Sequence, residues 1–114
     1  MDSILDTIKK LLGIAKDYTR FDTDIIVHIN TSMMLLNQLG IGPQEGFCIT
    51  GPEQTWLSYI PTGKNLEAVK TLIYLRTRLA FDPPANSFVV DSFQKQIEEY
   101  QWRLQVQAEN GGYV

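Results

Sequence analysis

The sequence has 114 residues, of which 44% are apolar, and it carries a net charge of −3 with a pI near 5.0. This length favours a single domain over residues 1–114, and the acidic balance disfavours a protein dedicated to gripping duplex DNA. One cysteine, Cys48, excludes an internal disulfide, and the absence of ~18 consecutive apolar residues or a secretory signal predicts a protein made in a cytoplasm and not inserted in a membrane.

Two helices are predicted in the N-terminal part of the chain. Ser3 can cap the first, which should end near Leu12 before Gly13. Asp22 can cap the second, which should run to about Leu39. Its apolar residues recur at helical spacing, so one face of this helix is expected to lie in the core.

The least regular stretch runs from residue 41 to residue 64 and is rich in glycine and proline. Such a composition excludes one continuous helix or strand. A short helix near residues 53–59 and a brief extended piece at residues 47–49 are predicted within it. A connection of this length in a compact domain is usually functional.

The C-terminal part predicts two more helices. Asn65 can cap the third, which should reach about Ala80. Asn86 or Ser87 can cap the fourth, which should reach about Gln107, with a flexible tail from about residue 108. The fold class is therefore all-α, a small bundle of about four helices with one long loop between the second and third.

The corner between the last two helices carries an unusual sequence, Asp82-Pro83-Pro84. Pro83 disfavours the α region for Asp82, and neither proline offers an N–H, so a short stiff elbow is predicted. Arg76 interrupts the apolar arc of the helix before this elbow. Either it forms an ion pair with Asp82 or its head extends to the rim of the core.

Both long helices carry apolar residues opposite their main apolar stripe. Val27 and Met34 do so on the second helix, and Phe88, Trp102 and Val106 on the fourth. A second apolar face indicates a protein–protein surface, here a subunit interface, unless the long loop covers it.

Catalytic and metal-binding patterns are missing from the sequence. His28 is the sole histidine, and Asp24 alone beside it makes a poor metal site, so we expect a structural histidine. No nucleophile elbow or phosphate loop is present, and we expect no enzyme, metal or cofactor. A helix-turn-helix regulator would place a short turn before an exposed basic helix, whereas the third helix is largely apolar.

Three stretches carry a family resemblance: "LDTIKKLLGIAKDYTRFDTDIIVHINTSMMLLNQLGIGPQEGF", "LEAVKTLIYLRTRLAFDPP" and "FQKQIEEYQWRLQVQAE". In this order and spacing they resemble the head–tail connector, or adaptor, proteins of tailed bacteriophages and prophages of Gram-positive hosts. The resemblance covers nearly the whole chain. Its most specific parts are the "KKLLGI…DYT.FD.DII.HIN" opening and the "LRTRLAFDPP" corner.

The resemblance implies a structural protein of the virion. Such proteins form a ring at the head–tail junction, typically of twelve copies, beneath the portal protein. The ring extends the channel through which DNA passes without sequence-specific binding, and it docks the next connector or tail protein. The family's C-terminal segment can contact the portal, which here implies a portal-facing role for Gly111, Gly112, Tyr113 and Val114. The alternative is a small helical phage or host regulatory protein that acts as a dimer through protein–protein or DNA binding.

Overall fold

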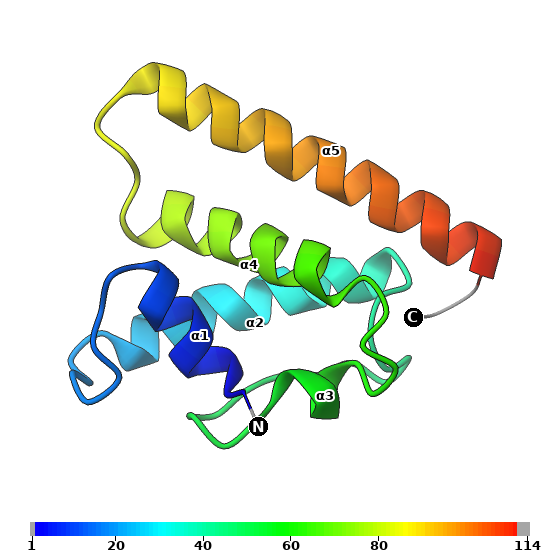
Figure 1. Cartoon of the computed structure of the whole chain (residues 1–114), viewed down its shortest axis with the longest axis horizontal. Helices are drawn as coiled ribbons and strands as arrows, with labels where there is room; N and C mark the ends of the chain where they lie inside the picture. Colours follow the sequence, from blue (N-terminus) through cyan, green and yellow to red (C-terminus); the bar gives the residue numbers. More distant parts are fainter. Residues whose placement is uncertain (1, 112–114) are drawn as a thin grey trace.

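The computed structural model describes residues 2–111, within which five helices and no strand occur. Figure 1 shows their arrangement. The helices are α1 (Ile4–Leu11), α2 (Asp22–Gln38), α3 (Trp56–Tyr59), α4 (Leu66–Phe81) and α5 (Ser87–Gly111). The predicted all-α class is confirmed, and the short α3 lies inside the long loop that separates α2 from α4.

The helix starts follow local side-chain chemistry at two of the predicted caps. The Ser3 hydroxyl accepts a hydrogen bond from the Asp6 backbone N–H at 3.2 Å, and the Asn86 side chain accepts one from the Phe88 N–H at 2.8 Å. Each bond satisfies an N–H that has no partner inside its helix. Asp22, predicted as a cap, is instead the first residue of α2.

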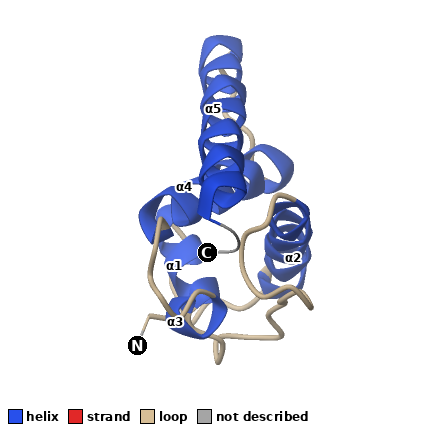
Figure 2. Cartoon of the chain, turned by 90° about the vertical axis from the view of Figure 1, so that its right-hand side faces the viewer, coloured by secondary structure: helices blue, strands red, loops and turns tan. Residues whose placement is uncertain are grey.

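Helix α4 is the centre of the molecule. Figure 2 shows α5 on one side of α4 and the other helices on the opposite side. The α4 residues Val69, Leu72 and Ile73 are fully buried, as expected for a helix covered on more than one face. Helix α5 contributes the predicted stripe, in which Ile97 and Leu104 are buried and three neighbours are half-buried: Val90, Phe93 and Tyr100.

The last turn of α5 corrects the prediction of a flexible tail from residue 108. The helix continues past Gln107 to Gly111, and Ala108 is buried. Its methyl group packs on Gly40 at the end of α2, where a Cβ atom would lie 3.0 Å from the Ala108 Cβ. This contact joins residues far apart in sequence, so local helix propensity could not reveal it.

The long loop packs against the core and does not extend freely into solvent. It buries apolar side chains at five positions: Ile41, Ile49, Trp56, Tyr59 and Ile60. The predicted extended piece at residues 47–49 is irregular, and the only bridge of the β type in the described residues joins Ser3 to Thr55. The Trp56 indole N–H donates to the Thr7 hydroxyl at 3.0 Å, which ties the loop to α1.

Tyr59 shows how tightly this loop is packed. Gly42 has a φ of +84°, and a Cβ there would lie 2.6 Å from the Tyr59 ring. Within the described residues, the buried Tyr59 hydroxyl has no hydrogen-bond partner. Burial disfavours the charged phenolate and raises the pKa of Tyr59 above its ordinary value.

Candidate interaction surfaces

Lys9 organises the connector between α1 and α2. Its side chain is buried, and its ammonium donates to the backbone carbonyls of Lys16 at 3.0 Å and Tyr18 at 2.7 Å. It also lies 2.8 Å from the Asp22 carboxylate. Three oxygen partners compensate the cost of burying this charge. The sequence analysis missed this cluster, although Lys9 lies one turn after Leu5, on the apolar side of α1.

The outer face of α2 is apolar and uncovered. Val27 and Met34 are each 55% exposed, while Ile25 and Ile29 on the same helix are fully buried. The long loop therefore leaves both predicted interface residues of α2 accessible in the single chain. Two large apolar side chains on one helix face favour a contact with another protein.

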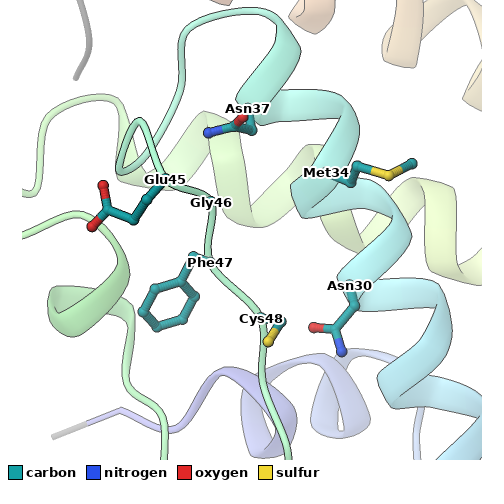
Figure 3. A pocket seen from close by; sticks show the side chains of 7 residues that line it. All are labelled: Asn30, Met34, Asn37, Glu45, Gly46, Phe47 and Cys48. Atoms are coloured by element: carbon teal, nitrogen blue, oxygen red, sulfur yellow. The ribbon is translucent and has the colours of Figure 1, made fainter.

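A shallow pocket of about 440 Å³ lies beside this face, between α2 and residues 45–48 of the loop. Figure 3 shows Asn30 and Asn37 reaching from α2 toward the loop. The Asn30 amide donates to the Ile49 carbonyl at 3.0 Å and accepts from the Ile49 N–H at 2.7 Å. The Asn37 amide donates to the Pro43 carbonyl at 2.6 Å.

The pocket walls are mostly apolar. Met34, Phe47 and the exposed Cys48 line it, and Glu45 is the sole charged side chain among the lining residues. This combination lacks the convergent polar groups of a catalytic site.

Helix α5 presents a second exposed apolar face. Phe88 is 83% exposed and Trp102 is 65% exposed, whereas Val106 is half-buried. Phe88 and Trp102 lie about 21 Å apart along the helix axis, from 1.5 Å of rise per residue. The predicted interface residues of α5 are thus spread along the helix, and Val106 contributes less accessible surface than predicted.

The ion pair predicted between Arg76 and Asp82 is wrong, because Asp82 lies beside Arg78. The Arg78 Nε is 4.0 Å from the Asp82 carboxylate and donates to the Asp82 carbonyl at 2.6 Å. Among the described residues, the buried Arg76 Nε has no hydrogen-bond partner. The pKa of Arg76 is lowered because burial disfavours its charged form. Both arginines lie on α4, and Arg78 has the i, i+4 spacing to Asp82 at which helix neighbours meet, whereas Arg76 lies six residues before Asp82.

Arg76 lines a second small pocket, of about 260 Å³, in the groove between α4 and α5. Its other lining residues are Leu79, Ala80 and Ile97, all apolar. The structure therefore agrees with the rim position considered for Arg76, with the Nε buried and the side chain bordering an open groove. In this position the Arg76 cation is surrounded by the apolar side chains that line the groove.

The elbow lies where the sequence predicts it. Helix α4 ends at Phe81, and Asp82 has left the helical conformation with φ −148° and ψ 71°. Pro83 and Pro84 follow without helical structure, and α5 begins at Ser87. The restriction that a proline places on the preceding residue accounts for this end point.

The structure also places the remaining predicted residues. His28 is half-buried, and within residues 2–111 no group of three or more His, Cys, Asp or Glu side chains is placed to hold a metal ion. No helix of the described chain combines the length and apolarity needed to cross a membrane. Of the predicted portal-facing tail, Gly111 ends α5, and residues 112–114 lie outside the described residues.

A family model described as phage connector protein matches residues 4–111. The chain matches no curated protein and no solved structure. The matched range contains all five helices, both apolar faces and the elbow. Because the match spans almost the entire sequence, the chain belongs to the phage connector protein family and is a structural component that joins other head or tail proteins of a phage particle.

Proposed function

We propose that this protein assembles head to tail into a ring at the head–tail junction of the virion, beneath the portal. The ring extends the DNA channel and receives the next connector or tail protein. The observation that carries this proposal is the pair of unlike apolar faces on one connector subunit, Val27 with Met34 on α2 and Phe88 with Trp102 on α5. The twelve-fold ring and the Gram-positive host type rest on the sequence resemblance.

Unlike faces favour a ring over a dimer. A two-fold dimer joins one surface to itself, whereas a ring joins two different surfaces of identical subunits. Two exposed apolar faces on a chain of 114 residues fit the second arrangement. Burying both faces at every contact removes apolar area from water, which is the main favourable contribution to association.

The charge of the chain suits a passage for DNA. The sequence has 13 acidic and 10 basic side chains, so a ring of such subunits has an acidic net charge. Tight binding to DNA would require several lysine or arginine contacts with phosphates. DNA passes through the proposed channel without sequence-specific binding, and the proposed role needs no catalytic residue or cofactor.

The portal contact is assigned to the end of α5. Gly111 is the last residue of α5, the longest helix, which Figure 1 shows along one edge of the molecule. Residues 111–114 are the portal-facing segment that the sequence resemblance implies. A helix that projects along the edge of the subunit can carry such a segment to a neighbouring ring.

The test is assembly with the purified portal protein of the same phage. Negative-stain images and native mass spectrometry of the mixture should show closed rings of this protein stacked on portal rings. A discrete dimer that does not bind the portal would contradict the proposal and support the alternative, a small regulatory protein. Tight binding to one duplex sequence, far above binding to random DNA at physiological salt, would also contradict it.

A further inference from the structure

We propose that the Arg76 guanidinium forms an ion pair with Glu45 of a neighbouring subunit, and that this Glu45 enters the groove between α4 and α5. The inference rests on the proposed ring, and it names the polar contact that fixes the register of one subunit against the next. It begins with the unpartnered Arg76 Nε, which is buried among the described residues.

Arg76 differs from the other arginines that the structure pairs. Arg78 is held by Asp82, and Arg103 donates to the Glu99 carboxylate at 2.6 Å. Arg76 is in no ion pair within residues 2–111, and its groove is otherwise apolar. Arg76 loses part of its hydration when the subunit folds. Pairing its cation with an anion from a partner therefore adds only the remaining part of the desolvation cost of this arginine.

The arrangement of a ring limits where that anion can come from. A head-to-tail contact joins two different surfaces, so a carboxylate on α5 itself, beside the groove, belongs to the wrong surface. The opposite apolar surface is that of α2 and the loop, with the exposed Met34 and Cys48. Glu45 is exposed, lines the pocket there as its sole charged residue, and forms no ion pair in the described chain.

The two surfaces are complementary in both charge and polarity. One has a cation bordered by Leu79, Ala80 and Ile97, and the other has an anion bordered by Met34, Phe47 and Cys48. Arginine binds carboxylates with a planar fork of donors, so such a pair fixes orientation as well as distance. Apolar walls around the pair exclude water and strengthen it.

The first test separates subunit stability from assembly. Arg76→Met keeps the length of the side chain and removes an unpaired charge, so the melting temperature of the subunit should stay level or rise. Assembly on portal rings should weaken at least tenfold. Arg78→Met is the matched control, which should melt earlier through loss of the Asp82 contact but assemble normally. An Arg76→Met variant that assembles like the parent would overturn the inference.

The second test identifies the partner carboxylate. Glu45→Gln should weaken assembly to a similar extent without changing the melting temperature. Reversing both charges, Arg76→Glu with Glu45→Arg, should restore ring formation that each single reversal abolishes. Failure of the double reversal, with both single variants folded, would overturn the pairing with Glu45.

The third test uses the native thiol. Ala80→Cys places a second thiol beside Arg76. Oxidation should then join this introduced thiol of one subunit to Cys48 of the next and give a ladder of covalent oligomers. Asp17→Cys in the exposed α1–α2 connector, outside both proposed surfaces, should give no ladder beyond dimers. If the parent protein fails to join portal rings, the proposed function fails. The thiol pair is then tested in the concentrated protein alone, where the absence of a ladder overturns the contact.

Discussion

Single buried or half-buried polar side chains set the connections of this small protein. Lys9 holds the α1–α2 connector through two carbonyls and Asp22, and Asn30 holds the loop through both hydrogen bonds to Ile49. Tyr59 is the contrasting case, since its hydroxyl is buried without a partner within the described residues. The contacts of Lys9 and Asn30 stabilise the subunit.

Tyr59 should limit the stability of the protein at alkaline pH. Its raised pKa means that the folded state retains a proton which the unfolded state releases above about pH 10. The free energy of unfolding should therefore fall as pH rises past that point, by up to about 1.4 kcal/mol per pH unit for this group. Tyr59→Phe should match the parent at pH 7 and lose less stability at pH 11. Equal losses in urea titrations at both pH values would contradict the assignment.

The residue scale also shows what the sequence could not predict. Ser3 and Asn86 were identifiable because caps act within a few residues. Lys9 was missed because its partners include carbonyls at the far end of a connector. The Arg76 pairing was wrong although the sequence indicated the correct pair, because Arg78 and Asp82 have the i, i+4 spacing of helix neighbours and Arg76 and Asp82 do not.

At the scale of elements, α5 is held at both ends. The elbow fixes its start, and the contact of Ala108 with Gly40 fixes its last turn. Between these points it packs on α4 through one narrow stripe, so most of its surface stays available. Its type and start were predictable from periodicity and capping, whereas its end depends on a contact with α2.

The two prolines should set the angle of α5 more than they set stability. Replacing Pro83 and Pro84 by alanine removes a restriction on the unfolded chain worth about 0.4–1 kcal/mol for each proline. The variant should melt slightly earlier, yet form open or irregular rings, because an angular error recurs at every subunit contact. Melting curves beside negative-stain images measure both effects. Closed rings of normal appearance would show that the angle is fixed elsewhere.

Gly40 should be required for the last turn of α5. Gly40→Ala places a methyl group 3.0 Å from the Ala108 Cβ and strains a residue with φ +92°, a conformation that costs L-residues about 1–2 kcal/mol. Hydrogen exchange should speed up in the last turn of α5. Gly13→Ala is the matched control, because its φ is +82° but no atom lies within 4 Å. Equal destabilisation with unchanged α5 protection would contradict the bracing role.

The whole molecule is a flat body of 38 × 35 × 19 Å with apolar faces on α2 and α5. Its all-α class and long loop were predictable because helical periodicity extends over each main segment. The accessibility of Val27, Met34, Phe88 and Trp102 was not certain from sequence, since the loop was a possible cover. Membership of the connector family fits exposed faces that contact other phage proteins, and the proposed ring assigns these faces to contacts between subunits.

Charge on the outer face of α5 should block assembly without unfolding the subunit. Trp102 is 65% exposed, so Trp102→Glu should change the free energy of unfolding by less than about 0.5 kcal/mol. Ring formation with the portal should be lost, because a carboxylate would be buried at each contact. Ile97→Glu, on the buried stripe of the same helix, should unfold the subunit. Circular dichroism and native mass spectrometry measure the two effects, and rings from Trp102→Glu would contradict the interface assignment.

The Asn30 amide has a consequence for how quickly partners can associate. It provides one donor and one acceptor to Ile49, as a peptide unit of a neighbouring strand would. The loop beside the α2 pocket is therefore ordered before any partner arrives. Much of the conformational entropy lost in shaping this surface is already lost during folding, so less remains to oppose binding. Subunits that meet should dock nearly as rigid bodies, and the rate of assembly should depend more on their orientation at encounter than on slow rearrangement of the loop.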